Sequence, residues 1–117
     1  MMQLNGKCKE KFLEWYWNEW FDDKERSYYE EKEIAVKALY TTDTVFLNAL
    51  IIEFFDSKNI FIEVSGIFYQ GFEPEFNYNI QEKGTLNGIN GEVFNSRQEA
   101  TIQAIKKANE IYNERFK

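Results

Sequence analysis

Histidine is absent from this sequence of 117 residues, and cysteine and proline occur only once each. Without histidine the chain lacks the usual general base at neutral pH and the commonest protein ligand of metal ions. Catalytic triads that pair serine or cysteine with histidine are therefore excluded. The single cysteine, Cys8, cannot form an internal disulfide or a thiolate metal cluster, so we expect a small, partly buried apolar residue in a reducing compartment.

Long apolar runs are also missing from the sequence. No window approaches the run of about 18 apolar residues that a membrane-spanning helix requires. The first residues, MMQLNGKCKEKF, lack the apolar stretch of a signal peptide. These absences predict a cytoplasmic protein that does not enter a membrane.

Acidic residues outnumber basic ones, 20 to 14, and the excess is uneven along the chain. The formal charge is −4 for residues 1–59, −4 for residues 60–95 and +2 for residues 96–117. Proteins bind a nucleic-acid backbone mainly through Lys and Arg, so a chain this acidic is a poor general nucleic-acid binder. The charge favours instead a partner protein with a basic face, such as a nucleic-acid-binding groove.

The apolar content suits one domain. Hydrophobic residues make up 44% of the chain and aromatic residues 18%, which is enough for one continuous core at this length. We therefore expect residues 1–117 to form a single domain. Within it, residues 1–42 would form an N-terminal helical extension, and residues 43–117 a core of helix, three strands and helix.

Helical spacing of apolar residues predicts three helices in the first half of the chain. They cover residues 6–23, residues 22–40 and residues 44–57. Asp43 or Thr42 can cap the third helix by accepting a hydrogen bond from a free N–H in its first turn. The core face of this helix would hold Phe46, Leu47, Leu50, Ile51, Phe54 and Phe55. Its solvent face would hold Asn48, Glu53 and Asp56.

After the third helix the apolar period changes to two, which predicts β-strands. The first strand begins at Ile60, and Gly66 is expected to mark a bulge. The turn QGFEPE, residues 70–75, leads into a second strand over residues 76–81. A glycine-rich turn then precedes a short third strand over residues 89–94. Three antiparallel strands in a row predict a meander.

The clearest local signal is SRQEATIQAIKKANEIYNERF, residues 96–116. Ser96 and Glu99 have the spacing of a capping box, so a helix begins there. Its buried stripe would hold Ala100, Ala104, Ile105, Ala108, Ile111 and Tyr112. The predicted fold class is α+β, with N-terminal helices, a three-stranded antiparallel meander sheet and a long C-terminal helix packed on the sheet.

Five aromatic residues crowd into the eight positions of EWYWNEWF, residues 14–21. The core face of this helix would hold Phe12, Leu13, Tyr16 and Trp20. Two interpretations of the remaining aromatic residues stay open: the second helix covers them, or they form an accessible patch beside acidic residues. The candidate partner-binding residues are Trp15, Trp17, Phe21, Asp22, Asp23, Glu30 and Glu31.

Neighbouring carboxylates are the remaining candidates for acid and base catalysis, as in sugar hydrolysis. All lie in stretches that solvated helix faces explain: Asp22 with Asp23, Glu30 with Glu31 and Glu33, and Glu53 with Asp56. FDDKERSYYEE lacks the glycine and the alternating ligands of a calcium loop, and GTLNGING lacks the pattern of a phosphate-binding loop. We therefore expect no enzymatic activity, no cofactor and no metal site.

The predicted order of helix, three strands and helix, with SRQEATIQAIKKA opening the last helix, is similar to the double-stranded-RNA-binding domain. In that family a serine-capped, lysine-rich start of the last helix grips phosphates. Ser96 matches the cap and Ala100 the small residue, but Gln98 and Glu99 stand where the family has lysine. The resemblance therefore implies the topology more strongly than RNA binding. The alternative hypothesis is a nucleic-acid-binding module that uses Arg97, Lys106 and Lys107.

The chain also resembles short accessory proteins of bacteriophages and prophages. Those carry an aromatic-rich N-terminal helix, a segment like VFLNALIIEFFDSKNI and a C-terminal helix like SRQEATIQAIKKANEIYNER. The resemblance implies a protein in the host cytoplasm that binds host machinery. Our main hypothesis is accordingly a non-enzymatic protein-binding domain that inhibits a host defence complex, such as a CRISPR nuclease, through an acidic surface. A structural protein that forms a homodimer through its tryptophan-rich helix is a further hypothesis.

Overall fold

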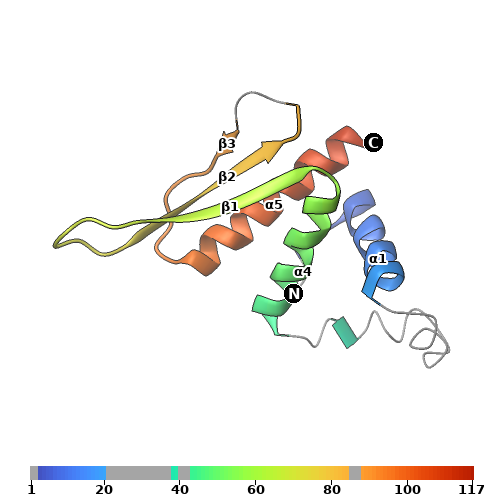
Figure 1. The fold of residues 1–117 in the computed structure, drawn as a ribbon, viewed down its shortest axis with the longest axis horizontal. Coiled ribbons are helices and arrows are strands. Elements are labelled where there is room, and N and C mark those ends of the chain that lie inside the picture. Colours follow the sequence, from blue (N-terminus) through green and yellow to red (C-terminus); the bar gives the residue numbers. More distant parts are fainter. Residues whose placement is uncertain (1–2, 21–37, 40–42, 85–87) are drawn as a thin grey trace.

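A computed structural model describes residues 3–20, 38–39, 43–84 and 88–117 (Figure 1). In chain order the elements are helix α1 (Gly6–Trp20), helix α4 (Thr44–Ser57), strand β1 (Ile60–Ile67), strand β2 (Glu75–Glu82), strand β3 (Ile89–Asn90) and helix α5 (Arg97–Arg115). The predicted α+β class, with a three-stranded antiparallel sheet and a long C-terminal helix, is confirmed. The helix predicted over residues 22–40 lies outside the described residues, except for Ala38 and Leu39.

Helix α5 lies along one face of the sheet, where it contacts β1 and β2 (Figure 1). It begins at the predicted cap, because Ser96 Oγ accepts a hydrogen bond of 3.1 Å from the N–H of Glu99. Helix α4 packs against β1 and α5, and α1 packs against α4 and α5. These elements enclose one core, in which the fully buried side chains include Phe12, Phe54, Phe55, Ile80, Ile105 and three alanines of α5, Ala100, Ala104 and Ala108.

Helix α4 has the predicted bounds, and Asp43 is its N-cap. The Asp43 carboxylate accepts a hydrogen bond of 2.8 Å from a backbone N–H in the first turn. Two predictions within the helix were wrong, since Asn48 is buried and Phe46 is exposed. Residues seven apart align along a helix, so Asn48 lies in line with buried Phe55, and Phe46 in line with exposed Glu53.

Strands β1 and β2 pair without interruption from one end to the other. The bulge predicted at Gly66 is therefore wrong. Gly66 is suited to its position for a different reason, because a Cβ there would lie 2.6 Å from the ring of Phe68. Burial alternates along β1 as predicted, beginning with buried Ile60 and exposed Phe61. One face of the sheet therefore meets the helices, and on the other face β1 carries exposed side chains.

The irregular strand is the third. Asn79 of β2 pairs with Asn90 of β3, and this register, if continued, would place Phe76 opposite residue 93. The observed bridge joins Phe76 to Phe94 instead. One extra residue is therefore accommodated between Asn90 and Phe94, as in a β-bulge. The continuous strand predicted over residues 89–94 is thus divided into two short pieces.

Three asparagines fasten the start of α1 to the last turns of α5. The N–H of Asn5 donates to Asn109 Oδ1 at 3.0 Å, and Asn109 Nδ2 donates to Asn5 Oδ1 at 2.9 Å. Asn113 Oδ1 accepts from the N–H of Cys8 at 2.8 Å, which satisfies one of the free donors at the start of the helix. Gly6 has a φ of +59°, and a Cβ there would lie 3.2 Å from the Asn113 amide. This junction therefore favours glycine.

We expect Asn109→Ala to lower the free energy of unfolding by about 1–3 kcal/mol, because the N–H of Asn5 loses its acceptor and Asn5 Oδ1 loses one of its two donors. Urea denaturation followed by circular dichroism measures the change. Asn95→Ala, at an exposed position before α5, is the matched control and should change stability by less than about 0.5 kcal/mol. Equal stability of the two variants would show that the junction contributes nothing.

Candidate functional site

The tryptophan-rich end of α1 is divided between core and surface. Trp15 packs edge to face on Phe54, with ring centroids 5.8 Å apart, and Tyr16 stacks on Phe12 at 6.4 Å. Trp20 was predicted to lie on the core face, but it is 42% exposed. Trp20 lies about 80° around the helix from fully buried Phe12. Its ring packs edge to face on the exposed ring of Phe46, with centroids 6.2 Å apart, at the margin of the core.

The predicted partner-binding residues are only partly described. Trp17 is half-buried on α1. A hollow of about 460 Å³ lies beside this end of α1, lined by Trp15, Glu19, Trp20, Glu53 and Ser57. The other candidates lie outside the described residues, and their role stays a prediction: Phe21, Asp22, Asp23, Glu30 and Glu31.

The cations predicted to contact nucleic acid are not brought together by the structure. Arg97 places its guanidinium 5.1 Å from the centroid of the Phe76 ring, at the start of α5. Lys107 pairs with Glu110 at 3.5 Å, and Lys106 is exposed. Lys106 and Lys107 follow about 14 Å further along the helix axis than Arg97. A phosphate-binding surface formed by all three residues is therefore not observed.

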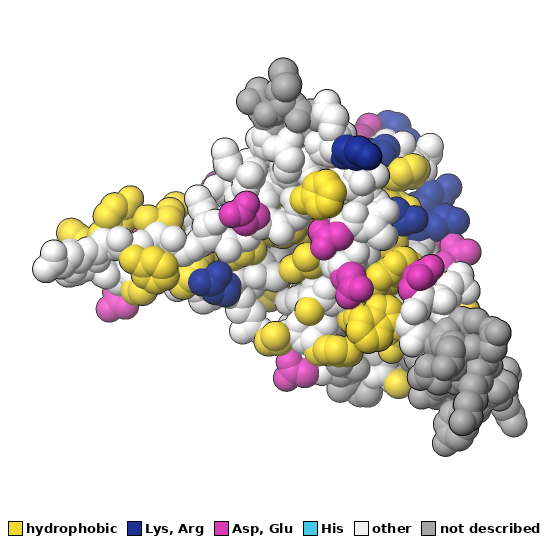
Figure 2. Space-filling view, viewed as in Figure 1, with side chains coloured by type: hydrophobic (Ala, Val, Ile, Leu, Met, Phe, Trp, Pro, Cys, Tyr) yellow, Lys and Arg dark blue, Asp and Glu magenta, His cyan; other side chains and the backbone are white. Residues whose placement is uncertain are grey.

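The most exposed aromatic side chains of the described chain lie on the hairpin tip, residues 67–75, which runs from the last residue of β1 to the first residue of β2. Phe68, Tyr69 and Phe72 are 69%, 61% and 77% exposed. The hairpin projects away from the helices in Figure 1, and Figure 2 shows hydrophobic side chains gathered on this projection. Clustered exposed aromatic side chains mark interaction sites on protein surfaces. The hairpin tip is therefore the best candidate for a binding site.

Contacts within the hairpin tip position the Phe68 ring and close the turn. The Phe68 ring packs edge to face on the ring of Phe76, with centroids 6.2 Å apart. The N–H of Phe72 donates to the carbonyl of Tyr69 at 3.2 Å and closes the turn. Gly71, within this turn, has a φ of +83°, which favours glycine. A bonded turn thus presents the three exposed rings.

The hairpin carries acidic side chains and no basic ones. Residues 60–82 contain four glutamates and neither Lys nor Arg. Glu73 and Glu75 are exposed within the hairpin tip itself. The hairpin tip therefore presents two carboxylates in the same short segment as its aromatic rings. Such a surface complements an apolar pocket with basic side chains around it.

Sequence reasoning assigned residues 70–75 to a turn and missed the hairpin tip as a site. A signal was present in IFYQGF, residues 67–72, where three aromatic residues stand beside the turn residue Gly71. Turns usually carry small or polar residues, for conformational reasons. Large aromatic residues in a turn that joins two strands are therefore candidates for binding.

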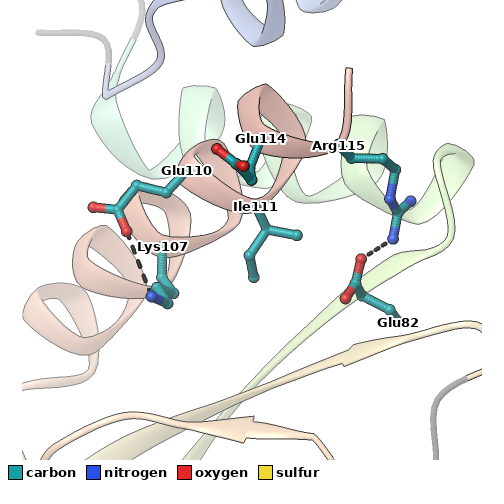
Figure 3. A pocket seen from close by; sticks show the side chains of 6 residues that line it. All are labelled: Glu82, Lys107, Glu110, Ile111, Glu114 and Arg115. Carbon is teal, nitrogen blue, oxygen red and sulfur yellow. Dashed lines mark hydrogen bonds and ion pairs between the residues drawn. The ribbon is translucent and has the colours of Figure 1, made fainter. Parts of the chain in front are cut away.

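A second hollow lies between α5 and the end of β2, with a volume of about 510 Å³ (Figure 3). Its lining consists of Ile111 and five charged residues. Arg115 pairs with Glu82, and Lys107 pairs with Glu110 at 3.5 Å. Because both cations already face carboxylates, the hollow has no net positive charge with which to select an anion.

Among the described residues, no group of three Cys, Asp or Glu side chains is placed to hold a metal ion. Burial raises the pKa of the Cys8 thiol to about 12. The nucleophilic thiolate is therefore scarce at neutral pH. No helix in the described part of the chain is long and apolar enough to cross a membrane.

No protein-family model, curated protein or solved structure matches this chain. The order α4, β1, β2, β3, α5 agrees with the topology that the resemblance to the double-stranded-RNA-binding domain implied. Membership of that family, and the resemblance to phage accessory proteins, stay predictions.

The buried thiol predicts a loss of stability at high pH. The fold favours the neutral thiol of Cys8, whose pKa rises from 9.0 to about 12. The stabilisation from the neutral thiol is complete at pH values below the pKa of Cys8 in the unfolded chain. It is lost as the pH rises from that value toward the pKa of Cys8 in the folded protein. We expect the free energy of unfolding to fall between these values by up to about 1.4 kcal/mol per pH unit.

Urea denaturation at a series of pH values, on the natural chain and on Cys8→Ala, measures this effect. The alanine variant should show a shallower fall, whatever its stability at neutral pH. Identical slopes in the two proteins would contradict the linkage of Cys8 to folding.

Proposed function

We propose that this protein is a non-enzymatic protein-binding domain that engages its partner with the hairpin tip. The exposure of Phe68, Tyr69 and Phe72 on one projection carries the proposal. Aromatic side chains bury large apolar areas when they enter a pocket, and they lose little conformational entropy in doing so. Such residues are common anchors of protein interfaces.

The partner that fits this surface has an apolar pocket surrounded by Lys or Arg. Glu73 and Glu75, both exposed in the hairpin tip, support this choice, because the hairpin itself contains no Lys or Arg; Glu82, at the far end of β2, pairs with Arg115 of α5. Opposite charges around an interface accelerate association and fix its orientation, while the buried anchors supply most of the affinity. In this interface the aromatic rings would provide binding strength and the glutamates would provide selectivity.

A basic nucleic-acid-binding groove on a host nuclease is one surface with this chemistry. The narrower hypothesis is a phage-encoded inhibitor of a defence complex such as a CRISPR nuclease. Its support is the acidic composition of the chain and the resemblance of its N-terminal, central and C-terminal segments to phage accessory proteins.

Phe72→Ala tests the proposal. Proteins captured from bacterial lysate on the immobilised natural chain are identified, and the affinity of each purified partner is then measured by calorimetry. We expect the variant to bind the partner at least about 30-fold more weakly, as for removal of an interface anchor. Because Phe72 is 77% exposed, the free energy of unfolding should stay within about 0.5 kcal/mol of the natural value.

Phe46→Ala is the matched control, because Phe46 is also an exposed phenylalanine, at 46%, but lies on α4. It should keep the affinity of the natural chain within about twofold. Partners that bind Phe72→Ala and Phe46→Ala equally well would exclude the hairpin tip as the binding surface.

A further inference from the structure

An apolar groove of about 350 Å³ lies between α4 and the first turns of α5. It is lined by Val45, Asn48, Ala49 and Ile52 from α4 and by Arg97, Gln98 and Thr101 from α5. Val45 is 66% exposed, so the groove opens to solvent. Its aliphatic side chains can receive one apolar side chain from a ligand.

The free edge of β1 can pair with another strand. The sheet order is β1-β2-β3, so within the described part of the chain β1 has a neighbouring strand on one side only. The carbonyl of Tyr78 accepts from the N–H of Gly91, which shows that the backbone of Tyr78 faces the third strand. Val64 is opposite Tyr78, so its N–H and C=O point to the free edge. The same alternation directs the backbone groups of Ile62 and Gly66 outward.

Arg97 connects this edge to the groove. The side chain lines the groove, and its Nη1 donates to the outward carbonyl of Val64 at 3.4 Å. The carbonyl retains a second lone pair for another donor. A strand added along β1 would therefore pass beside the groove.

The two faces of such a strand would meet different surroundings. Residues directly opposite each other on neighbouring strands share a face of the sheet. Side chains opposite Ile62 and Val64 would therefore point toward the helices and the groove. A side chain opposite Glu63 would lie on the other face, where Glu63 is exposed. Because opposite charges stabilise such cross-strand pairs, a Lys or Arg fits there.

We propose that the free edge of β1 and the adjoining groove bind an extended segment of the partner protein, in which apolar residues alternate with Lys or Arg. The main chain of the segment pairs with residues 62–66, and one apolar side chain fills the groove. This is recognition by β-strand addition. The inference rests on the proposed function, since it specifies how the partner docks, but it concerns a surface separate from the hairpin tip.

Val64→Pro tests the edge. The N–H that proline removes points away from β2, so the variant keeps the β1–β2 pairing, and proline is tolerated on sheet edges. The probe is a short synthetic peptide, blocked at both ends, in which lysine and valine alternate. A peptide of the same composition with contiguous valines is the control. We expect the alternating peptide alone to bind well, and Val64→Pro to weaken that binding at least about tenfold.

Amide hydrogen exchange measured by NMR locates the peptide. The amides of Ile62, Val64 and Gly66 should exchange more slowly when the peptide is bound, as they gain hydrogen-bond partners. Ala49→Phe, which fills the groove, should also weaken binding at least about tenfold. Glu110→Phe, at an exposed position of α5 outside the groove, is its matched control and should bind normally.

If the alternating and the control peptide bind equally well, the inference is overturned in favour of general charge attraction. The same holds if the alternating peptide binds Val64→Pro as tightly as the natural chain. A dimeric molar mass with protected edge amides in the absence of peptide would overturn the inference in favour of a second copy of the chain at this edge.

The proposal for the hairpin tip and the proposal for the β1 edge can fail separately. A captured partner that is lost by Phe72→Ala but kept by Val64→Pro supports the hairpin tip alone, and the reverse result supports the edge alone.

Discussion

The packing of α5 on the sheet is the constraint on which the remaining structure depends. Its buried alanines let the helix lie close to β1 and β2, and its first residue, Arg97, meets the ring of Phe76. Beyond that contact the hairpin continues, but the helix does not. Among the described elements, no helix lies beside residues 67–75 (Figure 1), and Phe68, Tyr69 and Phe72 are exposed there. Exposure of the hairpin tip thus follows from where α5 begins.

The other end of α5 holds α1 in place. Asn109 and Asn113 meet the start of α1 about one hundred positions earlier in the chain, and Phe12 then packs on Phe54. Such long-range contacts form only after distant segments have met, at an entropic cost of loop closure. The helix that covers the sheet therefore also organises the N-terminal part of the core.

Features that depend on one element alone were predictable from the sequence. The caps at Asp43 and Ser96 follow from local hydrogen bonding, and the bounds of α4 from apolar spacing. Features that depend on a neighbouring element were not predictable. Trp20 was placed in the core because periodicity groups side chains on one face of a helix but does not show how much of that face a neighbouring element covers.

The same limit applies to the sheet and the site. The extra residue between Asn90 and Phe94 becomes visible only when the register with β2 is known. The groove between α4 and α5 is formed by side chains of two helices that are far apart in the sequence, so no local motif predicts it. The hairpin tip could have been predicted as a binding site from the sequence, because turns usually carry small or polar residues and this one carries three aromatic residues.

A free strand edge beside exposed aromatic rings is a combination that normally promotes aggregation. In this chain the strand that presents the edge also carries Glu63, and the hairpin as a whole contains only acidic charge. Pairing of two copies along β1 would bring one acidic strand against another and would be opposed by their repulsion. A segment that carries Lys or Arg would instead be attracted by the same glutamates. In the proposed mode of binding, the charge of a single hairpin would therefore favour a basic foreign strand over a second copy of the chain.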